Sequence, residues 1–203
     1  MIKFQCLLPE VLEQYPIKKI STKDFKWIGK AYAYYKDKKN INKTIRCPGI
    51  FSLLEKGWIH RSYQDISIKT NGDRESFIVT TPHNQKQGFR GDILSDYVSC
   101  HPPEQMDIFK PMPEHTLKTI VKIQSPWKVS IPKNYYLLVG SVPYNDEDIF
   151  TVAPGLLQGD NFLNIQMFWH KLKGEHTIKK GTPLAYYLLI EKKNYDFSLE
   201  YIK

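Results

Sequence analysis

The chain has 203 residues, which is the size of one globular domain with or without an appended arm and too short for two full-sized domains. Hydrophobic residues make up 41% of it, and 10 Phe, 13 Tyr and 4 Trp supply enough apolar surface for a core, so wholesale disorder is excluded. The formal net charge is +8, and residues 1–50 carry most of the excess, with 11 basic against 4 acidic side chains. Such a field attracts nucleic acid, an anionic membrane or an acidic protein surface.

The three cysteines, Cys6, Cys47 and Cys100, are odd in number and widely separated, so they predict neither a disulfide framework nor a zinc site. The N-terminus has a short apolar run interrupted by Pro9 and Glu10, which is not typical of a signal peptide. The chain has no stretch of about eighteen apolar residues that would span a membrane. We therefore expect a reducing compartment and no membrane partner.

The first expected element is a strand over residues 2–8, and the second is a two-turn helix over residues 47–58. Pro48 suits the first helical position, Ile50, Phe51 and Leu54 share one face, and Gly57 is placed to end the helix. A second short helix is expected over residues 91–98.

Between these helices, Asn71-Gly72 predicts a tight two-residue hairpin joining strands at 65–70 and 74–81, because this pair adopts positive φ at low cost. The segment 101–115 holds Pro102, Pro103, Pro111 and Pro113 and is expected to cross between elements rather than to join a sheet.

The second half of the chain is expected to consist of strands. The clearest pattern places Leu163, Ile165, Met167 and Trp169 on one buried face, alternating with more exposed positions. Residues 126–132 and 135–142 are expected to form a hairpin around Pro132–Asn134. Further strands are expected at 117–123, 148–153, 183–192 and 197–202, with Lys180-Gly181 as a turn before the strand at 183–192.

Many short strands, two short helices and no βαβ rhythm predict an all-β fold, a β-sandwich or jelly roll with two short helices. We expect residues 1–45 to form a basic aromatic arm or edge strands, and residues 46–203 to form the core domain. Arg46, Trp58, Arg61, Trp127, Asp160 and Trp169 are expected to pack or hydrogen-bond around the main sheet.

The basic segment from Lys18 to Arg46 mixes cations with Trp and Tyr side chains. Cations neutralise phosphates and aromatic faces stack on bases, so this composition suits a nucleic-acid strand. It equally suits an edge strand guarded by lysines with aromatics turned to the core. The candidate binding residues in it are Lys18, Lys19, Lys26, Trp27, Lys30, Tyr34, Tyr35, Lys38, Lys39 and Arg46. Outside this segment, Arg61 and Asp160 are further candidate binding residues.

The remaining residues that could bind a metal or catalyse a reaction lack the sequence spacing of known sites. The six histidines lack the His-x-Asp or His-x-Glu spacing of a two-histidine, one-carboxylate metal site, and the nearest approach is His101 with Glu104. Asp146, Glu147 and Asp148 form an acidic cluster typical of a solvated turn. Nucleophile elbows, phosphate loops and dinucleotide fingerprints are absent, so no catalytic residue, metal or cofactor is assigned.

Residues 152–168 followed by 176–190 resemble the closing half of a dUTPase-like β-fold. In this resemblance the family's catalytic carboxylate falls at Gln158, which cannot act as a general base, and Asp160 lies two positions further on. The family's Pro-Arg-Ser turn is missing. The resemblance therefore implies a shared β architecture.

Residues 46–192 also resemble an uncharacterised family of β-rich proteins of tailed phages and bacteria. The matching features, in order, are the Arg46-Cys47-Pro48 helix start, Gly57-Trp58, a hairpin at 132–135, the turn before Asp160 and a Gly-x-Pro strand start at 181–183. Asn134 and Gly159 replace the usual Gly and Thr of two turns. This resemblance implies a phage genome and no established activity.

These observations favour a non-enzymatic phage-encoded binding or assembly protein, a virion structural or accessory component whose partners are other phage or host proteins. The alternatives are a metal-dependent or nucleotide-processing enzyme on the same scaffold, using two histidines and a carboxylate or Asp160 with Arg46 and Arg61, and a nucleic-acid-binding protein using the arm. We expect the host cytoplasm or the virion as its location, and the oligomeric state is left open.

Overall fold

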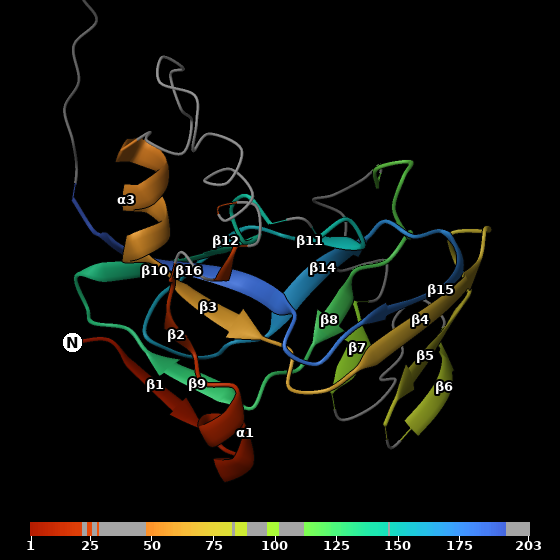
Figure 1. The fold of residues 1–203 in the computed structure, drawn as a ribbon, viewed down its shortest axis with the longest axis horizontal. Coiled ribbons are helices and arrows are strands. Elements are labelled where there is room, and N and C mark those ends of the chain that lie inside the picture. Colours follow the sequence, from red (N-terminus) through yellow and green to blue (C-terminus); the bar gives the residue numbers. More distant parts are fainter. Residues whose placement is uncertain are drawn as a thin grey trace, which may run out of the picture.

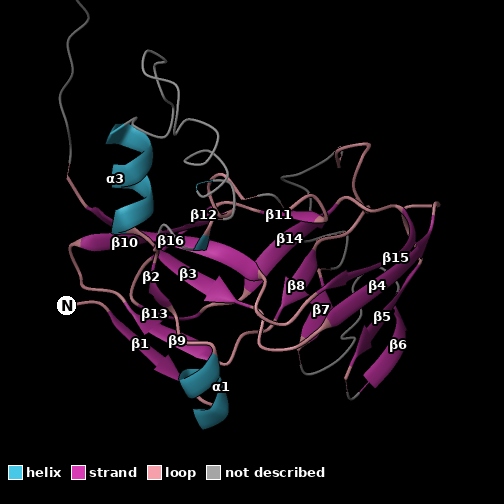
Figure 2. Cartoon of the chain, in the orientation of Figure 1, coloured by secondary structure: helices cyan, strands magenta, loops and turns pink. Residues whose placement is uncertain are grey.

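The computed structural model describes residues 1–21, 24, 25, 28, 48–82, 84–88, 97–101, 112–145 and 147–193. The described chain is β-rich, with two helices, α1 (Pro9–Gln14) and α3 (Pro48–Lys56), and strands that form four sheets (Figures 1 and 2). Every strand pairing is antiparallel. None of the helices in this part of the chain has the length and apolar character needed to cross a bilayer.

The four sheets are named by their strand order. A three-stranded sheet consists of β1 (Lys3–Cys6), β9 (Trp127–Ser130) and β13 (Asp160–Phe162). A five-stranded sheet consists of β12 (Gly155–Leu157), β10 (Tyr135–Gly140), β16 (Pro183–Glu191), β3 (Trp58–Arg61) and β2 (Lys18–Lys19). A third sheet consists of β11 (Phe150–Val152), β14 (Ile165–Trp169), β8 (Val121–Ile123) and β7 (Val98–Cys100). The fourth consists of β15 (Lys173–Ile178), β4 (Ile66–Asn71), β5 (Phe77–Thr81) and β6 (Asn84–Gly88).

The main core lies between these sheets and receives side chains from all four. The predicted alternation in the second half of the chain is confirmed, because Leu163, Ile165, Met167 and Trp169 are all fully buried. Trp127, Val129 and Ile131, which alternate with Lys128 and Ser130 along the chain, are also buried. Burying each such side chain stabilises the fold by about 1.5–3 kcal/mol.

A second, smaller core lies on the opposite face of the five-stranded sheet, under α3 (Figure 1). Neighbouring residues of β16 separate the two cores, since Tyr186 belongs to the smaller core and Tyr187 to the main one. Ile20, Phe25 and Ile28 are buried in the smaller core, so these described residues of the basic segment pack against α3.

The structure corrects two hairpin predictions. Strands β4 and β5 do pair, but Thr70 lies opposite Phe77, so the connection is longer than a two-residue Asn-Gly turn. Gly72 and Arg74 both have positive φ, at 101° and 67°. The predicted hairpin between 126–132 and 135–142 is wrong, because β9 pairs with β1 and β13 while β10 pairs with β12 and β16. The continuous apolar sequence of β10 suits an interior strand, which is where it lies.

Helix α3 confirms the first helix prediction, with Ile50 and Leu54 buried. The helix expected over 91–98 lies outside the described residues up to position 96, and Val98 begins strand β7. Helix α1 was not predicted, although Pro9 at its start and Glu10 in its first turn are typical helix-start signals. The strand expected at 197–202 also lies outside the described residues.

Gly57 follows α3 for a different reason from the one predicted. Its φ is not in the left-handed region, and a Cβ there would overlap the ring of Tyr186, whose Cζ would be 2.5 Å away. The Tyr186 ring crosses this position to let its hydroxyl donate a 2.6 Å hydrogen bond to the carbonyl of Leu53. Glycine is therefore required by the close approach of a side chain.

We expect Gly57→Ala to lower the free energy of unfolding by about 1–3 kcal/mol, because the methyl group forces the Tyr186 ring out of place. The measurement is urea unfolding followed by tryptophan fluorescence. Gly140→Ala is the matched control, since nothing lies within 4 Å of the Cβ that it would add. Equal stability of the two variants would show that the ring adapts freely.

Candidate functional site

The outer face of the three-stranded sheet presents a set of polar side chains around one exposed ring. Asp160 lies opposite Ser130, and Phe162 lies opposite Lys128. On the other side of β9, Gln5 also lies opposite Lys128. Directly opposed residues of an antiparallel pair point to the same side of a sheet, so these side chains share one face. The intervening Val129 points inward and is buried.

This face contains an open groove of about 450 Å³, here called the β9 groove, whose lining residues are Gln5, Lys128, Val129, Ser130, Asp160, Asn161 and Phe162. Phe162 is 50% exposed, and the Lys128 ammonium lies over its ring, 4.6 Å from the centroid. The lining offers a cation, an anion, an amide, a hydroxyl and an aromatic ring. Such a mixture can recognise a small polar ligand or a peptide.

Of the residues in this groove, only Asp160 was a candidate from the sequence. The sequence did contain a signal that Phe162 is exposed. In the strand pattern, Leu163 and Ile165 point into the core, so the even-numbered Phe162 falls on the opposite, outer side. Lys128 and Ser130 carried the same kind of signal, because they alternate with the buried Trp127 and Val129. Gln5 had no local signal, since it meets them only through the pairing of β1 with β9.

Arg61 holds the basic segment against the core instead of facing Asp160. Its guanidinium donates a 2.7 Å hydrogen bond to Asp24 and a 2.8 Å bond to the carbonyl of Gly181. Lys18 approaches the same Asp24 carboxylate at 3.5 Å. Because Arg61 lies in the five-stranded sheet and Asp160 in the three-stranded one, the expected convergence of these two residues on one pocket finds no support.

Lys19 is also engaged within the molecule. Its ammonium donates a 2.7 Å hydrogen bond to the carbonyl of Lys56 at the end of α3 and lies 3.7 Å from the centre of the Trp58 ring. A cation at this position interacts favourably with the helix C-terminus. Partial burial lowers the pKa of Lys19. The other candidates of the arm, Lys26, Trp27, Lys30, Tyr34, Tyr35, Lys38, Lys39 and Arg46, lie outside the described residues.

A histidine, a serine and a tyrosine form a hydrogen-bonded set inside the main core. The Nδ1 atom of His60 is 2.9 Å from the Tyr187 hydroxyl, and its Nε2 atom is 3.3 Å from the Ser125 hydroxyl. The Ser125 hydroxyl also accepts a 3.1 Å hydrogen bond from the backbone N–H of Trp127. A serine beside a histidine is the arrangement of many nucleophilic sites. Here His60 is only 1% exposed, so the set joins strands and does not face a substrate.

Burial controls the ionisation of this set. Removal from water lowers the pKa of His60 to about 3 and raises the pKa of Tyr187. His60 is therefore neutral at physiological pH, with one ring nitrogen donating and the other accepting a hydrogen bond.

The other histidines and acidic residues do not assemble a metal centre in the part of the chain that the structure describes, where no three His, Cys, Asp or Glu side chains gather closely enough to hold an ion. His115 and His170 stack with their ring centroids 5.3 Å apart, and the His170 Nε2 atom is 3.0 Å from the Thr151 hydroxyl. Burial and the neighbouring His115 lower the pKa of His170.

The acidic cluster that the sequence singled out is used in local contacts. Asp148 accepts a 2.7 Å hydrogen bond from the Lys171 ammonium, which lowers the pKa of that carboxyl. Glu147 accepts a 2.9 Å bond from the backbone N–H of Ile149. Asp146 lies outside the described residues.

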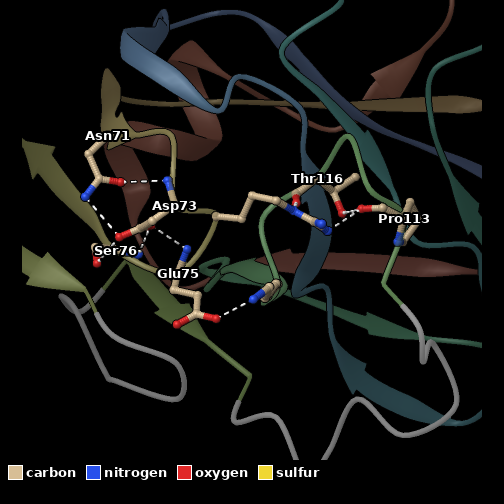
Figure 3. Close-up of polar contacts among 8 residues, drawn as sticks. Asn71, Asp73, Glu75, Ser76, Pro113 and Thr116 are labelled. Atoms are coloured by element: carbon tan, nitrogen blue, oxygen red, sulfur yellow. Dashed lines mark hydrogen bonds and ion pairs between the residues drawn. The ribbon is translucent and has the colours of Figure 1, made fainter.

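The turn between β4 and β5 contains a polar network, which Figure 3 shows in close-up. The Asp73 carboxylate accepts hydrogen bonds from the backbone N–H groups of Glu75 and Ser76 and from the side chains of Asn71 and Ser76, at 2.7–2.9 Å. These donors lower the pKa of Asp73. Its oxygens are fully used in shaping the turn.

Arg74 extends this turn toward the segment before β8. With positive φ, it directs its guanidinium to the carbonyls of Thr116 and Pro113, at 2.8 and 2.7 Å (Figure 3). Its own carbonyl accepts a 2.9 Å bond from the backbone N–H of Lys118. The network is therefore a structural connection between the turn and residues 113–118.

No protein-family model matches the sequence, and no curated protein matches it. Among solved structures, this chain is similar to a dUTPase of Staphylococcus bacteriophage 80alpha that was solved with dUpNHpp. The sequence identity is 10%, the TM-score is 0.41, and the match covers 100% of this chain and 88% of that chain. This is a distant structural likeness to a phage dUTPase-like β-fold, and it assigns no activity to the chain.

The buried His60 predicts a loss of stability in mild acid. Its pKa is lower in the folded chain than the value of about 6.5 expected after unfolding, so the unfolded chain binds the extra proton between these two values. The resulting contribution to stability is present above pH 6.5 and is lost as the pH falls toward 3. Between pH 7 and pH 5 we expect this residue to account for a decrease of about 2 kcal/mol in the free energy of unfolding.

The measurement is urea unfolding of the wild type and of His60→Gln, which removes the titrating group, with His115→Gln as an exposed histidine control. The slope of stability against pH should be clearly shallower in His60→Gln than in the wild type or in His115→Gln. NMR of the wild-type His60 ring provides a second measurement that does not depend on the variant folding. Titration of this ring near pH 6.5 would contradict the prediction.

Proposed function

We propose that this protein is a non-enzymatic binding or assembly protein, encoded by a phage and acting as a virion structural or accessory component. The observation that carries the proposal is the β9 groove, where a half-exposed Phe162 is surrounded by polar side chains on a solvent-facing sheet. Aromatic side chains are enriched at interaction sites relative to the rest of a protein surface. The phage context comes from the resemblance of residues 46–192.

The scaffold suits such a role. We take it to be a β-sandwich or jelly roll, in which β9 contributes Trp127 and Val129 to the core and Lys128 and Ser130 to the groove. A ligand-binding face built on paired strands is held more rigidly than one built on loops. Its partners are other phage or host proteins or their attached groups, and its location is the virion or the host cytoplasm.

The contacts in the described chain support the enzyme alternative less than they support the binding proposal. The serine–histidine pair, Ser125 and His60, is buried in the core. Arg61 is occupied by Asp24 and the Gly181 carbonyl, so it does not accompany Asp160 in a catalytic pocket. The groove therefore favours binding over chemistry.

The nucleic-acid alternative relied on the arm. Lys18 and Lys19, its two described candidates, contact Asp24, Trp58 and the end of α3. Binding phosphates with these lysines would have to compete with those contacts, which makes the groove the better-supported surface.

The virion version of the proposal predicts that the protein is present in purified particles. Particles from an infected culture are separated on a density gradient and probed with antibody against the recombinant chain. We expect a constant number of copies per particle across the gradient peak. Absence of the protein from particles would contradict the virion role.

If the β9 groove is the surface that binds the partner in the particle, Phe162→Ser should reduce incorporation of the protein into particles at least tenfold, because this ring is the largest exposed apolar group in the groove. Leu156→Ser is the matched control, since Leu156 is 57% exposed on β12, in a different sheet. Equal loss in both variants would show that incorporation does not depend on the groove.

A further inference from the structure

We propose that the β9 groove binds a neutral carbohydrate, an inference that rests on the proposed binding function and names the ligand class of that site. The groove lies on the outer face of the three-stranded sheet, where Asp160, Ser130 and Lys128 come from two adjacent strands and Gln5 from the third. Its volume of about 450 Å³ falls within the range of about 300–1,000 Å³ that small-molecule sites have.

The ring of Phe162 supplies the stacking surface. The face of an aromatic ring carries partial negative charge and attracts electropositive groups. The Lys128 ammonium already uses this property, at 4.6 Å from the ring centroid. The C–H groups on one side of a sugar ring are also electropositive, so a sugar can take the place of the ammonium over Phe162. Lys128 is then released to donate hydrogen bonds to the sugar hydroxyls.

The polar side chains match hydroxyl groups in both directions. Each hydroxyl of a sugar donates one hydrogen bond and accepts others, so its site needs donors and acceptors side by side. Lys128 donates, Asp160 accepts, and Gln5 and Ser130 do both. A site for a phosphate or carboxylate would contain donors alone.

The charge balance of the groove argues against a polyanion. Its lining contains one cation, Lys128, and one anion, Asp160. Lys3 lies opposite Ser130 on the same face and raises the total to a single positive charge. Binding of nucleic acid gains its affinity from several uncompensated cations, and here Asp160 would face the phosphates. A neutral ligand with many hydroxyls therefore fits the groove better than nucleic acid or an acidic protein.

The test uses the full chain on an array of neutral and anionic glycans, with a dT10 oligonucleotide as a separate probe. We expect binding to one or more neutral glycans, with little change between 50 and 500 mM NaCl. NMR titration with the tightest neutral glycan should shift the backbone amides of Ser130, Asp160 and Phe162.

The variants locate the site. Phe162→Ser and Asp160→Asn should each weaken binding of that glycan at least tenfold. Both positions are on the surface, so we expect both variants to fold, and an unchanged thermal midpoint checks this. Leu156→Ser, on a different sheet, should bind like the wild type. Gln5→Ala provides a second, smaller change in the same groove.

Three outcomes would overturn the carbohydrate proposal. They are an absence of binding to every neutral glycan, unchanged binding by Phe162→Ser, and binding of anionic glycans or dT10 alone. If glycan binding fails while incorporation into particles still depends on Phe162, the ligand class is wrong and the binding function stands. If a neutral glycan binds while the protein is absent from particles, the virion role is wrong and the carbohydrate site stands.

Discussion

The hydrogen bonds of His60 connect the five-stranded sheet with the segment that leads into the three-stranded sheet. The ring lies on β3 and contacts Tyr187 of β16 on one side and Ser125 on the other, where the chain passes from β8 to β9. The Ser125 hydroxyl in turn accepts a hydrogen bond from the backbone N–H of Trp127, the first residue of β9. A buried neutral imidazole is one of the few side chains that can satisfy two hydroxyl groups on opposite sides. These hydrogen bonds therefore hold the start of β9 beside the five-stranded sheet.

The position of β9 then determines the candidate site, because this strand has different neighbours on its two faces. Trp127 and Val129 are buried in the main core, while Lys128 and Ser130 line the groove. The period of two along a strand makes these roles inseparable: a shift of one residue would bury Lys128 and expose Trp127. The energetic cost of that exchange is large, so the stability of the core also holds the groove residues in register. The side chains of Lys128 and Ser130 are in this way held in place by the core packing of Trp127 and Val129.

The sequence allowed prediction of those features that depend on local patterns. The alternation of Leu163, Ile165, Met167 and Trp169 and the boundaries of α3 were clear because neighbouring residues determine them. The pairing of β9 was not clear, since adjacent strands commonly form hairpins, whereas here β9 pairs with the distant β1. The groove required this non-local pairing, which explains why Gln5 was not a candidate, whereas Asp160 was named from the resemblance of its turn to known families. Gly57 shows the same limit, because the need for glycine arises from Tyr186, far along the chain.

In the proposed binding, the net charge of the chain and the contacts in the groove have different effects: the charge affects how often a ligand is encountered, and the contacts affect which ligand is bound. The sequence places 11 basic and 4 acidic residues in positions 1–50, whereas the groove lining is balanced between Lys128 and Asp160. A net positive charge acts over about a Debye length, roughly 8–10 Å at physiological salt, and raises the rate of encounter with any anionic surface. Hydrogen bonds and contacts with the Phe162 ring act only at short range and determine which ligand stays bound in the groove. A neutral sugar displayed on an anionic surface would use both: the charge would speed the encounter, and the short-range contacts around Phe162 would set the dissociation rate.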